Sequence, residues 1–114
     1  MLTKEEAEVA AICDLRQEVN SGGFDSYFRY WGANSAELAL IALPTVLGQD
    51  WADLLRSAIA QFGTDYPVDV HLRERLLDGT SVSEALETLD ARFLDLEASV
   101  DADSLLTVHL TSAT

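Results

Sequence analysis

The segment Glu18–Trp31, EVNSGGFDSYFRYW, constrains the fold more than any other part of the chain. Its aromatic residues stand at the i, i+3, i+4, i+7 spacing of a single helix face: Phe24, Tyr27, Phe28 and Trp31. We expect this face to be buried, in a short helix that Gly32 closes. Two glycines, Gly22 and Gly23, precede it. They suit a chain that leaves one helix at Asn20, takes a positive φ or a close backbone approach, and starts another helix.

Length and composition predict one globular domain that spans residues 1–114, because 48% of the residues are hydrophobic. A single cysteine, Cys13, cannot form an internal disulfide, which fits a reducing compartment. The N-terminal sequence MLTKEEAEVAAI is too acidic for a secretory signal. The longest uncharged run, Leu38–Gln49, is far shorter than the roughly 20 residues needed to cross a bilayer. We therefore expect a cytoplasmic protein without membrane contact.

The charge balance is strongly acidic, with 20 acidic and 7 basic side chains and a formal net charge of −13. Beyond Arg75, Arg92 is the only lysine or arginine. Such a field repels nucleic acid and anionic lipid and attracts basic protein surfaces, so direct nucleic-acid binding is disfavoured. The alternative, that the acidity only keeps the protein soluble, stays open.

Capping and periodicity signals divide the N-terminal half into helices. Thr3 and Glu6 form a capping box that begins the first helix. A later helix starts at a cap on Asn34 or Ser35 and must end or kink at Pro44, which lacks an amide proton. The expected inward side chains of these two helices are Ile12, Leu15 and Val19, and Leu38, Ile41 and Ala42.

The same signals predict helices in the C-terminal half. A helix capped by Asp50 runs to Gly63 at its C′ position, and the loop Gly63–Val68 separates it from a helix over Asp69–Leu77. Ser81 and Glu84 suggest a second capping box, on a helix that reaches about Glu97. The expected inward residues are Trp51, Leu54, Leu55, Ala58, Ile59 and Phe62, then Leu72 and Leu76, then Val82, Leu86, Leu89, Phe93 and Leu96.

Residues 104–110 fit either a helix or a short strand, because Thr107 and Val108 are β-branched. No pair of alternating segments with a tight turn occurs anywhere in the sequence. The pattern predicts an all-α fold, a single-domain compact bundle of about six or seven short helices.

Three segments together resemble a bacterial family of small acidic helical proteins whose best-known member is a DNA mimic: EVNSGGFDSYF, GQDWADLLRSAIAQFG and LETLDARF. The resemblance extends from about Leu15 to Leu110 and depends on the patterns N-x-G-G-F-x-x-Y-F and L-D-x-x-F. It implies an all-helical fold. For the mimic, it implies binding to a transcription factor through an acidic surface that occupies the DNA site. Many relatives have no known function.

The residues of these patterns are interpreted as structural. We expect a helix corner and buried core at Gly22, Gly23, Phe24, Tyr27 and Phe28. Asp90 lies at the edge of an apolar stripe, and a carboxylate in such a place needs a hydrogen-bond partner. It is therefore expected to be a hydrogen-bonded helix anchor and not a catalytic acid.

Catalytic and metal-binding spacings are missing from the sequence. Cys13, His71 and His109 stand alone, without HExxH or CxxC spacing, and no Walker loop, GxGxxG or GxSxG occurs. We expect Cys13, in mid-helix, to be an inert small hydrophobe, and His109 to pack or cap beside Leu106 and Leu110. The sequence thus predicts no metal, no cofactor and no enzymatic activity.

The carboxylates expected to face outward and bind a partner are Asp14, Glu18, Glu84, Glu87, Asp95, Asp101 and Asp103. Neighbours at i+3 or i+4 on a helix are about 5 to 6 Å apart and can pair with lysines and arginines that normally hold phosphates. The leading hypothesis is DNA mimicry, in which the protein occupies the basic surface of a DNA-binding protein such as a transcription regulator.

Other interpretations stay open at this point. Any solvated acidic helix shows the same pattern. An immunity or antitoxin-like protein that inhibits a basic toxin or nuclease would use similar electrostatics, and the chain could be a monomer or a homodimer. A small hydrolase or ligand-binding domain would need a concave polar pocket, and a filled apolar centre around Phe24, Phe28, Trp51 and Phe93 would argue against it.

Overall fold

The computed structural model describes residues 1–79 and 81–112, and within these ranges it contains helices and no strand. The elements are α1 (Lys4–Phe28), the 3₁₀-helix η1 (Trp31–Ser35), α2 (Ala36–Val46), α3 (Gln49–Ala60), α4 (Val70–Gly79), α5 (Val82–Ser99) and α6 (Ala102–Ser112). The all-α prediction is confirmed, and the ambiguous segment 104–110 is helical. In the part of the chain that is described, no helix is long and apolar enough to cross a membrane.

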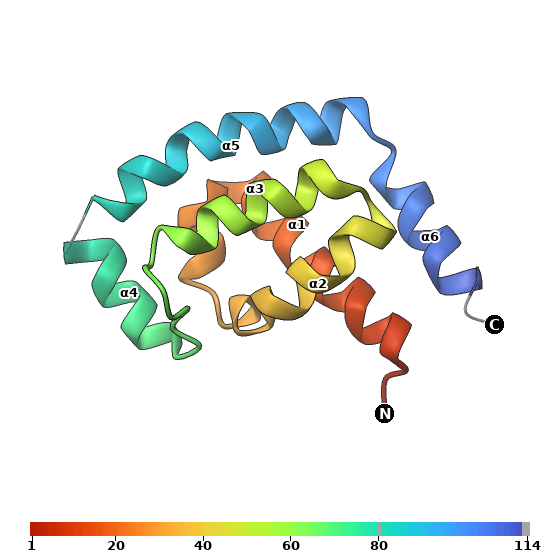
Figure 1. Cartoon of the computed structure of the whole chain (residues 1–114), viewed down its shortest axis with the longest axis horizontal. Helices are drawn as coiled ribbons and strands as arrows, with labels where there is room; N and C mark the ends of the chain where they lie inside the picture. Colours follow the sequence, from red (N-terminus) through yellow and green to blue (C-terminus); the bar gives the residue numbers. More distant parts are fainter. Residues whose placement is uncertain (80, 113–114) are drawn as a thin grey trace.

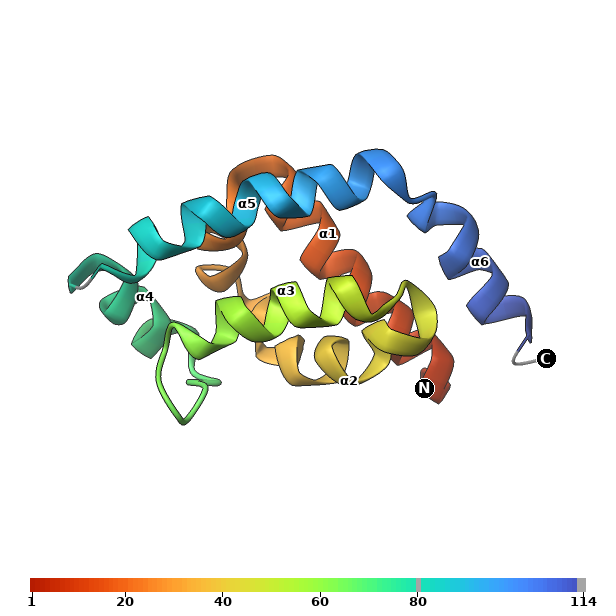
Figure 2. The ribbon, with the colours of Figure 1, turned by 45° about the horizontal axis from the view of Figure 1, so that its top comes forward.

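Four helices form the body of the molecule. The longest two, α1 and α5, pack against each other, while α2 and α3 form a hairpin that packs on α1 and α5 respectively. Figure 1 shows α4 at one end and α6 at the other, with both chain termini near α6. Figure 2 shows the same arrangement after rotation, with α5 crossing the top of the bundle. The outer side of α5 is therefore exposed along its whole length.

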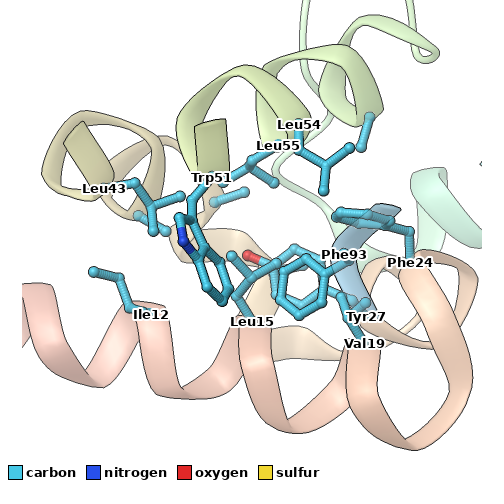
Figure 3. Close-up of a cluster of buried hydrophobic side chains, with 14 of the residues drawn as sticks. Ile12, Leu15, Val19, Phe24, Tyr27, Leu43, Trp51, Leu54, Leu55 and Phe93 are labelled. Atoms are coloured by element: carbon cyan, nitrogen blue, oxygen red, sulfur yellow. The ribbon is translucent and has the colours of Figure 1, made fainter. Parts of the chain in front are cut away.

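The core lies between α1, α2, α3 and α5 (Figure 3). Phe93 of α5 is at its centre, with its ring centroid 5.6 Å from that of Phe24 and 5.3 Å from that of Trp51. Phe28 extends the aromatic cluster to Phe62, at 4.8 Å. Phe24 and Phe28 are fully buried, and Phe93 and Trp51 are exposed by at most 2%. The centre of the bundle is filled with apolar side chains.

The expected corner at the glycine pair is present, a little later than Asn20. Gly22 and Gly23 have non-helical φ/ψ angles that divide α1, and Gly23 has φ of 80°. A Cβ on Gly23 would lie 2.4 Å from Oδ2 of Asp90. The same carboxylate accepts a hydrogen bond of 2.7 Å from the backbone N–H of Phe24. Asp90 thus makes the hydrogen bond expected of a helix anchor, and it ties the corner of α1 to α5.

The predicted aromatic face is only partly correct. Phe24, Tyr27 and Phe28 are fully buried, but the side chain of Trp31 is 65% exposed. The reason is that α1 ends at Phe28 and the backbone of Tyr30 is extended, with φ of −101° and ψ of 140°. The helical spacing therefore stops before Trp31, which instead begins η1. The predicted short helix is present after the glycine corner, but it ends at Phe28 and not at Gly32.

Helix α2 also differs from the prediction. Pro44 does not end the helix, which continues to Val46. Pro44 is exposed and lies in the last turn, so only one helical hydrogen bond is lost there. Ile41 is 74% exposed and not inward. The buried residues of α2 are mostly small: Ala36, Ala39, Ala42, Leu43 and Val46.

The predicted caps have mixed outcomes. The capping box of Thr3 and Glu6 is confirmed, with both reciprocal hydrogen bonds present. Asp50 is not an N-cap, because α3 begins one residue earlier, after Gly48. Ser81 precedes α5 but makes no side-chain capping hydrogen bond, so the second predicted capping box is wrong.

Helix α4 presents a different face from the one predicted. Leu72 is 39% exposed, and Leu76 is half-buried. The buried residues are instead Arg73 and Leu77. Hydrophobic periodicity missed this face because its largest buried side chain is a charged one.

Arg73 is fully buried and binds backbone oxygens. Its Nε donates to the carbonyl of Phe28 at 2.8 Å, and Nη2 donates to that of Tyr30 at 3.0 Å. Nη1 donates to the carbonyls of Pro67 and Val68, at 2.9 and 2.8 Å. These contacts pair the carbonyls at the end of α1 and in the loop before α4 with a donor, and the carbonyl of Tyr30 also accepts from the backbone N–H of Ala33 at 3.1 Å. Arg73 therefore joins the C-terminal end of α1 to the start of α4.

Candidate protein-binding surface

The outer side of α5 carries three exposed carboxylates that we call the outer acidic stripe: Glu84, Glu87 and Asp95. They lie on the side of the helix opposite its buried residues, which are Val82, Leu86, Leu89 and Phe93. Within residues 1–79 and 81–112, none of the three has a hydrogen-bond or ion-pair partner. The geometry predicted for these residues is present, and their binding role stays a prediction.

A groove of about 340 Å³ lies between α3 and the part of α5 that carries Asp95. Its lining residues are Asp50, Asp53, Leu54, Arg92, Asp95 and Leu96. Leu54 is buried and Leu96 half-buried, whereas the four charged residues are exposed. The groove thus joins apolar side chains to an acidic rim.

Sequence reasoning missed Asp50 and Asp53 as members of this surface. It placed Asp50 in a capping role, whereas the start of α3 after Gly48 leaves this side chain without a partner among the described residues. Asp53 accepts hydrogen bonds from Gln49 at 2.8 Å and Arg56 at 2.9 Å. The i, i+3 spacing of the two aspartates was the available signal.

Two of the predicted partner-binding carboxylates take part in the junction between α5 and α6. Asp101 accepts hydrogen bonds from the backbone and hydroxyl of Ser104, and these lower its pKa. Asp103 pairs with Arg16 at 2.9 Å, and Arg16 also binds Glu97 through two hydrogen bonds. The charge of Asp103 is therefore partly neutralised within the protein.

Asp14 and Glu18 lie on a different flank of α1. The carboxyl carbon of Asp14 is 3.2 Å from the position that a Cβ on Gly32 would occupy, so it faces η1. Burial, and next the charge of Glu18, raise the pKa of Asp14. Glu18 accepts a hydrogen bond of 3.0 Å from the hydroxyl of Ser26. Arg16, which binds Glu97 and Asp103, faces α5 and α6. The carboxylates predicted to bind a partner therefore do not form one surface around α1, because Asp14 and Glu18 lie on a different flank from Asp103.

The remaining reactive side chains lie apart from these surfaces. Cys13 is exposed on α1, and partial burial raises the pKa of its thiol, while its expected inertness stays a prediction. His109 is half-buried, with Nε2 3.0 Å from Oε1 of Glu8, and it joins α6 to α1. His71 is exposed on α4. Among the residues described, no three His, Cys, Asp or Glu side chains come together as a metal site.

The replacement Glu97→Gln should flatten the acid dependence of stability. Hydrogen bonds from Arg16 hold the pKa of Glu97 below its usual range. A carboxylate with a lowered folded-state pKa stabilises the protein above its unfolded pKa of about 4.3, and this stabilisation is lost as the pH falls through the folded pKa. Urea denaturation near neutral pH should show the variant less stable by about 1 kcal/mol. This difference in stability should shrink below about pH 4. A difference that is independent of pH would contradict a lowered pKa of Glu97 in the folded protein.

The fold and the surface define a class: a small, strongly acidic, all-helical protein with carboxylates directed outward from one long helix. The family described as DMP19-like protein matches residues 1–111. The chain therefore belongs to the DMP19-like family. No curated protein and no solved structure matches the chain significantly.

Proposed function

We propose that this protein is a DNA mimic without enzymatic activity, which occupies the basic surface of a DNA-binding protein such as a transcription regulator. One observation supports this most: Glu84, Glu87 and Asp95 project from α5, and none of them forms an ion pair among the described residues. Membership of the DMP19-like family supports the same proposal. The filled apolar centre favours a role in binding, because a small-molecule enzyme requires a concave pocket with convergent polar groups.

The charge density of this surface indicates which partner it fits. Glu84 and Asp95 are separated by about 16 Å along the helix axis. Duplex DNA carries roughly ten charges over that length. The outer acidic stripe and the two aspartates of α3, Asp50 and Asp53, supply at most five, and Asp53 is paired with Arg56. Because this surface carries fewer charges than the duplex, the partner's affinity for this chain should fall less steeply with salt than its affinity for DNA.

Charge reversal of the outer acidic stripe tests the proposal. The triple replacement of Glu84, Glu87 and Asp95 by lysine should weaken binding of the captured partner about 100-fold, because attraction becomes repulsion at three positions. Circular dichroism should remain helical. Binding is measured by affinity capture from the native host, followed by titration of the purified partner.

The matched control changes the net charge equally on other elements. It replaces Glu37, Asp65 and Glu74, on α2, the α3–α4 loop and α4, by lysine, and it should weaken binding much less. Equal weakening by both triple variants would mean that only the overall charge matters. Added duplex DNA should displace the protein from its partner. A captured nuclease or toxin that ignores DNA would instead favour the inhibitor function.

A further inference from the structure

Trp31 is a large aromatic side chain exposed on an acidic protein. It is 65% exposed, whereas Trp51 is 2% exposed and part of the core. The ring of Tyr30 lies beside it, with centroids 5.1 Å apart and ring planes inclined by 50°. Exposed tryptophans of this kind are enriched among the residues that contribute most to protein–protein binding.

The turn that carries Trp31 is held in place on both sides. Arg73 donates to the carbonyl of Tyr30 at 3.0 Å, immediately before Trp31. The hydroxyl of Tyr66 donates to the carbonyl of Ala33 at 2.6 Å, two residues after it. Both donors belong to the α3–α4 loop or to α4, so distant parts of the chain hold the backbone on both sides of Trp31. A partner then has to order only the side chain and not the turn, which lowers the entropic cost of binding.

Unpaired negative charge lies next to these rings. A Cβ on Gly32 would be 2.4 Å from the ring of Tyr30 and 3.2 Å from the carboxyl carbon of Asp14, so both groups lie against this glycine. Within residues 1–79 and 81–112, the carboxylate of Asp14 has no hydrogen-bond or ion-pair partner. Glu18 lies one turn further along α1 and is close enough to raise the pKa of Asp14. Aromatic faces and carboxylates are thus adjacent on this flank.

We propose that Asp14, Glu18, Tyr30 and Trp31 form an arginine-binding site for a protein partner. A guanidinium can stack on the indole of Trp31 while its N–H groups reach the carboxylate of Asp14. Lysine fits less well, because its ammonium group is strongly hydrated and cannot present two parallel donors. This inference rests on the proposed function, since the basic partner supplies the arginine. It adds a second contact on the flank of α1 away from α5.

Nuclear magnetic resonance with short peptides tests the site. The probes are acetylated tri-arginine amide and tri-lysine amide, titrated into the full ¹⁵N-labelled chain. The arginine peptide should shift the indole N–H signal of Trp31 and the backbone amides of Asp14 and Gly32. The indole signal of Trp51 serves as an internal reference, because this side chain is buried.

Two variants make the assignment specific. Trp31→Leu should weaken binding of the arginine peptide about two- to five-fold, because the stacking on the indole is lost. The affinity for the lysine peptide should stay nearly unchanged. Asp14→Asn should weaken both peptides, and it keeps the test valid if the first variant folds poorly. Leu94→Ala, at another exposed apolar position, is the control and should change neither affinity.

The outcomes separate this site from the proposed function. Arginine-peptide shifts confined to Glu84, Glu87 and Asp95, or an unchanged affinity in Trp31→Leu, would overturn the arginine site and leave DNA mimicry standing. A second outcome is that Trp31→Leu weakens binding of the arginine peptide, while charge reversal on α5 leaves the captured partner bound. In that case the arginine site is supported and the proposed function is contradicted.

Discussion

Replacing Arg73 by methionine should lower the free energy of unfolding by about 4 kcal/mol or more. The variant would leave the buried carbonyls of Phe28 and Pro67 without the guanidinium donor, and each such group costs roughly 1–3 kcal/mol. It would also lose the part-buried bonds to the carbonyls of Val68 and Tyr30. A buried ion pair can often be replaced by apolar residues at little cost, because both charges are removed together. Here the acceptors belong to the backbone and remain. Since domains of this size are stable by only about 5–15 kcal/mol, the variant should be close to unfolding.

Urea denaturation followed by circular dichroism measures this effect. Arg75→Met, an exposed position on the same helix, is the matched control and should change stability by less than about 0.5 kcal/mol. Arg73→Lys should recover part of the loss, because the ammonium group keeps three donors but not the planar fork. A stability of Arg73→Met within about 1 kcal/mol of the natural protein would show that the carbonyls find other donors.

Replacing Gly23 by alanine should cost about 2–4 kcal/mol, for two reasons that add. Its φ of 80° with ψ of −179° is a backbone conformation that only glycine adopts readily, and the strain costs about 1–3 kcal/mol. The new Cβ would also lie 2.4 Å from Oδ2 of Asp90 and displace the carboxylate that binds the Phe24 N–H. The loss of that part-buried hydrogen bond adds roughly 1 kcal/mol.

Gly63→Ala separates the two causes. Gly63 also has a positive φ, of 97°, but nothing lies within 4 Å of its Cβ position. Chemical denaturation should therefore show a smaller loss for Gly63→Ala than for Gly23→Ala. In a double-mutant cycle, Asp90→Ala should reduce the cost of Gly23→Ala, because the clash is gone. If the two replacements change the free energy of unfolding additively, the close approach between Gly23 and Asp90 is contradicted.

Features of the fold that depend on neighbouring residues along the chain could be predicted. The capping box at Thr3, the glycine corner and the inward stripe of α5 are local patterns, and the structure contains all three. The direction of Trp31 could not be predicted, because the turn before it is fixed by Arg73 on another helix. Arg73 itself was missed, since hydrophobic periodicity does not mark a buried charge whose hydrogen-bond partners are backbone oxygens from distant segments.

The same distinction applies to the candidate site. The exposed positions of Glu84, Glu87 and Asp95 follow from their spacing against the apolar residues of α5. The pairing of Asp103 with Arg16 joins residues from opposite ends of the sequence and had no local signal. The groove beside α3 also depends on packing between distant helices.

The hydrogen bonds of Arg73 have a consequence for evolution. Because each acceptor described is a main-chain oxygen, mutation of the accepting residues leaves the oxygens in place, whereas loss of the guanidinium cannot be repaired by one further change. The loop at Pro67 and Val68 is therefore free to diverge. Distant homologues should retain an arginine at this position even where that loop has changed beyond alignment.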